Sequence, residues 1–140
     1  MKTITNLCDL AEKKNIPIIS FHICNDSVEA LSQCDDDGDC IIAIDDTKIK
    51  NEADLKVKMA HELGYCETGA FYNRYSPFDE IGRHEYRADK WAVYELVPFD
   101  ELVVALNKGY NEAWQLAEYF DVSEDFIDKA FYIYKAKGLL

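Results

Sequence analysis

The β-type segments of this chain are confined to one short region, and this order limits the possible folds more than any other feature. Three runs have the β-branched, aromatic and apolar residues typical of strands: PIISFHI (17–23), VEALSQC (28–34) and CIIAID (40–45). The third run is continuously apolar, so we expect it to be the central strand. Because helical patterns lie before and after these runs, the order predicts an α+β fold with a small, three-stranded, mostly antiparallel sheet.

Helical periodicity accounts for most of the remaining chain. Ile4, Leu7, Cys8 and Ala11 recur at the spacing of one helix face, and Asn15 ends this first helix. The other helices are predicted at residues 51–66, 77–97, 100–107, 111–120 and 123–137.

Capping residues set the limits of the two long helices. Asn51 is a favourable N-cap, with Asp54 three residues later as in a capping box. Pro77 favours a helix start, and Pro98 stops the same helix. Between the two helices, residues 67–76 are rich in Gly, Asn and Tyr, and we expect them to form a loop.

The acidic stretch DDDGD (35–39) lies between the last two predicted strands. It resembles the start of a calcium loop, but the remaining EF-hand ligands and the closing glutamate are missing, so we predict a hairpin turn. Cys34 and Cys40 flank the turn and can face each other across the strands; zinc binding by this pair is the less favoured alternative. All five cysteines are expected to be free thiols, because their number is odd and no secretory signal is present.

Length and charge limit the classes of function. With 140 residues, of which 49% are hydrophobic, residues 1–140 are expected to form a single domain. The net charge of −12 disfavours nucleic acid and anionic membranes as partners. The N-terminus lacks the pattern of a signal peptide, and no apolar run approaches the roughly 20 residues of a membrane span, so we expect a cytoplasmic protein.

Residues 116–131, LAEYFDVSEDFIDKAF, have the rhythm of a helix-turn-helix. A helix that reads DNA needs basic or amide side chains, whereas this second helix begins Ser123-Glu124-Asp125. The segment 111–137 carries six acids and three lysines, a net charge of −3. We therefore expect a packed helical pair that does not bind nucleic acid, and whose acidic face can dock a basic protein surface.

The segment MAHELGYC (59–66) follows the pattern of a zinc-peptidase helix up to Gly64. In HExxH, two histidines four residues apart share one helix face and bind one metal, and the glutamate acts as general base. His61 and Glu62 fit this pattern, but Tyr65 stands where the second histidine is expected. Gly64 costs roughly 1 kcal/mol inside a helix relative to alanine, so it indicates either a backbone that passes close by or a fraying helix end.

A third metal ligand is expected from the next helix, because catalytic zinc takes three protein ligands and keeps one open position. Glu85 lies twenty residues after Tyr65, and Asp89 follows one turn later on the same face. Asp89 can hold the free N–H of His61 and fix its tautomer. The spacing is gluzincin-like, and the alternative for both acids is a solvated helix face.

Three quoted segments resemble the ImmA/IrrE family of zincin-like metallopeptidases, which are common in prophages and mobile elements: KMAHELGYCETGAFYNRYSPFDEIGRHEYRADKWAVYELVP, the preceding IIAID and the terminal WQLAEYFDVSEDFIDKAF. The resemblance implies a zincin-like metallopeptidase fold and zinc held by two histidines and a glutamate. It also implies hydrolysis of a DNA-binding repressor. By this resemblance His61 and Glu85 match zinc ligands and Glu62 matches the catalytic base.

Tyr65 leaves three alternatives for the metal site. Zinc lowers the pKa of an acid that it coordinates, so Tyr65 can serve as a tyrosinate ligand. His84 or Cys66 can substitute, although each lies off the ligand face and would need local unwinding of the helix. The third alternative, which we favour, is weak or absent zinc, because one of three protein ligands is lost.

Further candidates lie close to the motif in sequence. Tyr72, Tyr75 and His84 can donate hydrogen bonds to an oxyanion or can simply pack. Cys66 is a possible nucleophile beside His61, but no third group orients it, so we disfavour this role.

Two functions follow from these patterns. The first is a zinc-dependent endopeptidase, a hydrolase of a phage or mobile element that acts on a helix-turn-helix repressor and whose metal site is impaired by Tyr65. The second is a non-catalytic pseudo-peptidase that grips a regulator protein without cleaving it.

Overall fold

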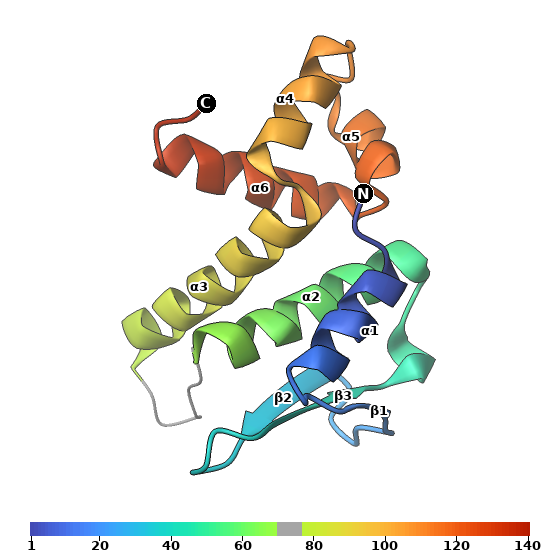
Figure 1. The fold of residues 1–140 in the computed structure, drawn as a ribbon, viewed down its shortest axis with the longest axis vertical. Coiled ribbons are helices and arrows are strands. Elements are labelled where there is room, and N and C mark those ends of the chain that lie inside the picture. The colour runs from blue at the N-terminus through green and yellow to red at the C-terminus, as the bar shows by residue number, and fades with distance from the viewer. Residues whose placement is uncertain (70–76) are drawn as a thin grey trace.

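The computed structural model describes residues 1–69 and 77–140, and its elements follow the expected order (Figure 1). The first part comprises helix α1 (Ile4–Lys13), strands β1 (Ile18–Ser20), β2 (Ala30–Cys34) and β3 (Cys40–Ile44), and the short 3-10 helix η1 (Asp46–Lys48). The second part comprises helices α2 (Glu52–Thr68), α3 (Phe78–Leu96), α4 (Phe99–Asn107), α5 (Ala113–Phe120) and α6 (Glu124–Ala136).

The later helices lie where capping and periodicity predict them. As expected, the Asn51 side chain accepts a hydrogen bond of 2.8 Å from the backbone N–H of Asp54. The Asp54 carboxylate in turn accepts one from the N–H of Lys50. At its other end α2 finishes on Gly69, whose positive φ of 65° suits a residue without a Cβ atom. Among the described helices, none is long and apolar enough to cross a membrane.

The sheet is mixed, with strand order β1-β3-β2. Strand β2 pairs antiparallel with β3, and β1 pairs parallel with β3. The α+β class and the central position of β3 are confirmed. The mostly antiparallel arrangement that we expected is corrected to one parallel and one antiparallel pairing. The chain reverses direction twice between β1 and β3, once in the connection to β2 and once in the hairpin, so these two strands run the same way.

The predicted hairpin turn at residues 35–39 is confirmed. The Asp35 carboxylate accepts hydrogen bonds from the backbone N–H groups of Asp37 and Asp39, each at 2.9 Å. This Asx-type arrangement uses the first acid of DDDGD to close the turn. Gly38 adopts a positive φ of 84°, which explains the glycine in this stretch.

The same hairpin determines the pairing of two cysteines. Its register places Cys34 directly opposite Cys40, with their Cα atoms 4.1 Å apart, and the two are joined in a disulfide. The expectation that all five cysteines are free thiols is therefore wrong for this pair. Residues in closely spaced cross-strand positions bring their side chains together whatever the total number of cysteines in the chain.

The connection from β1 to β2 is held by charged side chains of the η1 region. Lys48 Nζ donates to three backbone carbonyl oxygens, those of Ile23, Asn25 and Val28, each at 2.8 Å. The buried carboxylate of Asp45 accepts the Ile23 N–H at 3.0 Å. The two predicted strands at 17–23 and 28–34 are therefore shorter than expected, since these contacts stabilise a loop between them.

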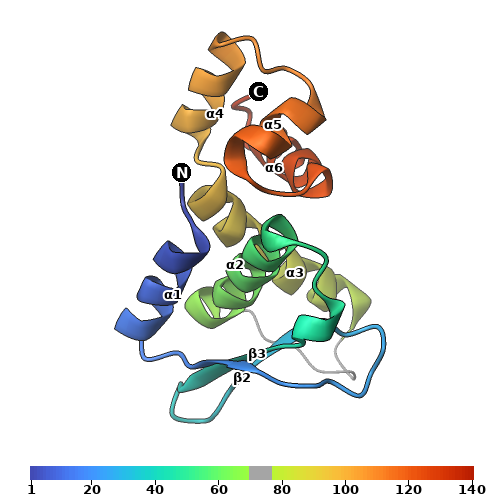
Figure 2. The same cartoon turned by 90° about the vertical axis from the view of Figure 1, so that its right-hand side faces the viewer.

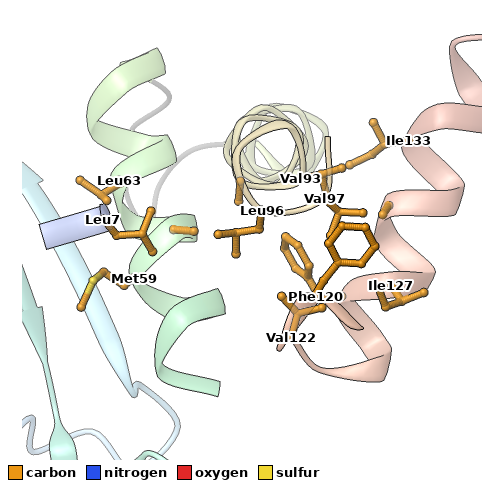
Figure 3. Packing of buried hydrophobic residues seen from close by; sticks show 14 of the residues in the cluster. Leu7, Met59, Leu63, Val93, Leu96, Val97, Phe120, Val122, Ile127 and Ile133 are labelled. Carbon is orange, nitrogen blue, oxygen red and sulfur yellow. The ribbon is translucent and has the colours of Figure 1, made fainter. Parts of the chain in front are cut away.

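Most of the buried apolar side chains form one cluster around α3 (Figure 3). On one side Leu96 lies toward Leu7 and Leu63, and on the other Val97 lies toward the α5–α6 pair. The sheet is covered by α1 and α2, and α4 to α6 gather at the far end of the molecule (Figure 2). Helix α3 thus runs from the core to the outer end of α2, where the polar residues of both helices meet.

The buried side chain of Lys56 connects α2 to the N-terminal residues and to α5. Lys56 is only 1% exposed, and its ammonium group donates at 2.7 Å to the carbonyl oxygens of Lys2 and Phe120. The Phe120 carbonyl belongs to the last turn of α5, where carbonyl groups lack partners within the helix. Burial lowers the pKa of Lys56, and the nearby charge of Asp121 opposes that change.

Candidate functional site

Helices α2 and α3 pack side by side (Figure 1). Two polar pairs of residues meet across this contact. His61 and Tyr65 lie one turn apart on α2, and Glu85 and Asp89 lie one turn apart on α3. His61 Nε2 is 3.2 Å from Glu85 Oε2, and His61 Nδ1 is 2.8 Å from Asp89 Oδ1. The Tyr65 hydroxyl donates to the Glu85 carboxylate. The structure therefore brings together four residues that the motif spacing singled out.

The charge state of His61 follows from its two carboxylate neighbours. Burial acts to lower the pKa of this imidazole, but hydrogen bonds and charge from Asp89 and Glu85 outweigh burial and raise it to about 9. At pH 7 His61 is thus an imidazolium that donates to both acids. Its Nε2 must lose a proton before it can bind a metal ion.

Tyr65 is buried against the ring of His61. Its side chain is 7% exposed, and its ring meets the His61 ring edge-on with centroids 4.9 Å apart. Because both His61 and Tyr65 donate to Glu85, this carboxylate accepts from two successive turns on one face of α2.

Gly64 explains how the two helices come close enough for these contacts. A Cβ atom built on Gly64 would lie 2.6 Å from the carbonyl oxygen of Ala88 and 3.1 Å from its Cα atom. Of the two readings of this glycine, close passage of another backbone is therefore confirmed. Glu85 lies three residues before Ala88 and Asp89 directly follows it, so the acids of the site belong to this closely packed stretch of α3.

Replacing Gly64 with alanine should reduce stability although alanine favours helix. The gain in propensity is about 1 kcal/mol, whereas overpacking against backbone typically costs about 1–3 kcal/mol. We expect a net loss of up to about 2 kcal/mol in the free energy of unfolding by urea. The matched control is Gly82→Ala on α3, where an added Cβ meets nothing within 4 Å, so stability should stay level or rise. Equal stabilisation by both changes would contradict the close approach.

A cleft of about 580 Å³ opens beside the polar group. Residues of β2 and the preceding residues 27–29 line it together with residues of α2, and Glu85, Asp89 and Lys129 complete the lining. Strand β2 is at the edge of the sheet, because in the described part of the chain it pairs with β3 alone. The loop held by Lys48 therefore forms part of the rim of this cleft.

Glu62 lines the same cleft from α2 and is directed toward β2. Its side chain is buried at 7% exposure. Burial raises the pKa of the Glu62 carboxyl, while a hydrogen bond from Ser32 and the charge of His61 act in the opposite direction. Ser32 is a site residue that the sequence analysis did not identify, because a serine in an alternating strand carries no signal of its own.

Lys129 is a second residue that the sequence did not reveal. It reaches the site from α6, and its Nζ lies 3.4 Å from Asp89 Oδ1. Asp89 is thus shared between the imidazolium of His61 and a lysine forty residues away in sequence. No local pattern links such distant residues, so only their tertiary packing identifies the contact.

The other candidate residues do not belong to the group formed by His61, Tyr65, Glu85 and Asp89. His84 Nε2 lies 3.4 Å from Glu80 on its own helix, and His84 is not among the residues that line the cleft. Cys66 lies beside Cys34 and Cys40 instead of His61. Burial, with Glu62 and Glu67, raises the pKa of the Cys66 thiol to about 11, so at neutral pH it is a protonated thiol and a poor nucleophile.

Two further candidates, Tyr72 and Tyr75, belong to residues 70–76 and lie outside the described residues.

The three expected zinc ligands must be deprotonated before they can bind the ion. His61 and Tyr65 both contact the carboxylate of Glu85, so the three expected zinc ligands lie together. However, zinc binds neutral imidazole and deprotonated acids, and here the imidazolium and the phenol both direct their protons at Glu85. An ion that binds here would therefore have to displace both of these protons.

The mixed sheet, the HE-bearing helix and the acid-bearing helix beside it define a metallopeptidase-like domain. The model of the peptidase M78 family, described as IrrE N-terminal-like domain, matches residues 14–132, and the chain belongs to this family. No curated protein and no solved structure matches the chain.

Proposed function

We propose that this chain is a peptidase-family protein that binds an extended segment of a protein partner along β2, and that its hydrolytic centre is impaired at Tyr65. The observation that carries the proposal is the contact of Tyr65 with Glu85. The phenol stands where a second imidazole would be needed, and with protonated His61 it occupies the carboxylate expected to bind zinc.

The edge position of β2 supports the binding of an extended polypeptide. The hydrogen-bonded pair at Asp35 and Asp39 sets the alternation along the hairpin, so the N–H groups of Ser32 and Ala30 point away from β3. An added strand binds to such outward backbone groups, and alternate side chains then enter the cleft. Both residues line the cleft.

The chemistry of the chain supports a basic partner. The net charge of −12 attracts positively charged surfaces, and α6 begins with Glu124 and Asp125 in its first turn. We propose that the partner is a DNA-binding repressor of a prophage or mobile element, as the family membership suggests. The protein itself is not proposed to bind DNA.

A second candidate is an active endopeptidase with Tyr65 as a tyrosinate ligand of zinc. The convergence of Tyr65, His61 and Glu85 favours it, as does the raised pKa of Glu62, which suits a group that takes and returns a proton. The zinc content of the chain purified with its Cys34–Cys40 disulfide intact separates the two candidates, because the first requires well under one ion per chain and the second requires one.

The partner complex should weaken with salt and with a change in β2. Tagged protein should recover a helix-turn-helix regulator from the native host at low salt, and binding of that purified regulator should fall as ionic strength rises. Ala30→Pro removes an outward N–H without removing a bond to β3, so it should weaken binding at least about tenfold while the fold remains. Val104→Ala, at an exposed position of α4, is the control.

Two results would count against this proposal. One is recovery of no DNA-binding protein at low salt. The other is unchanged affinity of the folded Ala30→Pro variant for the regulator, which would place the contact elsewhere.

A further inference from the structure

Three sulfur atoms meet outside the polar group of His61, Tyr65, Glu85 and Asp89. Those of Cys34, Cys40 and Cys66 all lie within 4.8 Å of one another. Two come from the β2–β3 hairpin and the third from the last turns of α2, and both elements lie on the same side of the molecule (Figure 1). Cys40 belongs to the buried core and Cys66 packs against that core, so the sulfur atoms meet where the hairpin and α2 are in contact.

The surroundings of this cluster favour a cation. Glu62 and Glu67 lie close enough to Cys66 to act on it electrostatically, and both are acidic. Cys40 is buried, Cys66 is partly buried and Cys34 is exposed. The exposed sulfur provides a path from solvent, and the buried sulfur limits access by larger molecules.

We propose that Cys34, Cys40 and Cys66, once the disulfide is reduced, form a site for one thiophilic divalent cation of the zinc or cadmium type. Zinc–sulfur bonds of about 2.3 Å place two sulfurs of one ion about 3.8 Å apart, which lies within the observed separation limit. Three thiolates leave a fourth position for water. Such thiolate sets select soft and borderline metals over magnesium or calcium.

Before a cation can bind, a reductant such as a dithiol must reduce the Cys34–Cys40 disulfide. The dithiol gives two electrons and two protons to the Cys34–Cys40 bond and itself becomes a disulfide. The cation then displaces one proton from each of the three thiols. The bound ion would connect the hairpin to α2, so the two walls of the cleft would be tied together at this end. The site does not depend on the proposed function, because it shares no ligand with the polar group.

A cadmium titration tests the site directly. The full chain, reduced with a non-thiol phosphine under inert gas, should take up one Cd²⁺ per chain with ultraviolet thiolate-to-cadmium charge transfer. Cys66→Ser and Cys34→Ser should each weaken binding at least about tenfold and reduce the charge-transfer intensity, because a ligand is lost. The exposed cysteines provide matched controls, and Cys8→Ser and Cys24→Ser should change nothing.

Further controls separate cadmium binding by the three cysteines from binding by the candidate zinc site. His61→Gln and Glu85→Gln should leave cadmium binding unchanged, which separates this site from the candidate zinc site. Without reduction the band should be absent. Unchanged binding by folded Cys66→Ser, checked by circular dichroism, would overturn the proposal. So would equal loss in Cys8→Ser, or no stoichiometric binding by the reduced chain.

Discussion

Tyr65→His should convert a chain that holds well under one zinc ion into one that holds one ion per chain. The change places two imidazoles one turn apart on α2, facing Glu85 on α3, and leaves a fourth position for water. Loss of an outer-shell partner typically costs 10–100-fold in metal affinity, so restoring a direct ligand should raise affinity by more than about 100-fold. Metal analysis after gel filtration, and competition with a chelator, measure the difference.

Zinc should also stabilise the Tyr65→His variant against heat, because an ion that binds only the folded chain stabilises it by mass action. Tyr65→Phe is the matched control, since it keeps the ring and removes the hydroxyl that contacts Glu85. It should gain no zinc. If the unmodified chain binds one zinc tightly and Tyr65→Phe loses it, the tyrosinate candidate is correct and the impaired site is not.

The same variant allows a test of Glu62. If Tyr65→His restores hydrolysis of the regulator, adding Glu62→Gln should abolish cleavage while zinc remains bound. Glu62 lines the cleft and is expected to act as the base instead of a zinc ligand, so its replacement should not remove the ion.

Stability in the absence of metal should fall as pH rises from about 6.5 to about 9. The pKa of His61 is raised from 6.5 to about 9 in the folded chain, so folding favours its protonated form. The stabilisation is complete below the unfolded pKa and is lost as pH passes the folded pKa. This difference in pKa corresponds to about 3 kcal/mol, measured as the free energy of unfolding in chelator-containing buffer.

Replacement of the histidine should flatten this dependence. His61→Gln keeps a neutral hydrogen-bonding side chain between Glu85 and Asp89 but cannot be protonated, so its stability should change little over the same range. His22→Gln alters an exposed histidine whose side chain is 74% accessible, and it should retain the fall seen in the unmodified chain. An unmodified chain with constant stability between pH 6.5 and 9 would show that His61 is neutral in the folded protein.

Local sequence determined the elements of this fold and the faces that carry the site. Caps and 3.6-residue periodicity placed the helices, because those signals act within one or two turns of chain. The four-residue spacings of His61 with Tyr65 and of Glu85 with Asp89 required only helical geometry to put each pair on one face. Gly64 indicated a close neighbour because a glycine inside a helix is otherwise costly.

Only the tertiary structure decided which distant groups meet and which of them carry protons. The disulfide between Cys34 and Cys40 depends on hairpin register, and the place of Cys66 beside it depends on how α2 packs against the sheet. The contact of Lys129 with Asp89 crosses from α6 to α3. The protonation of His61 depends on two carboxylates from another helix in a buried setting, where charge interactions are strong. These properties arise from distances through space, which residue order alone does not specify.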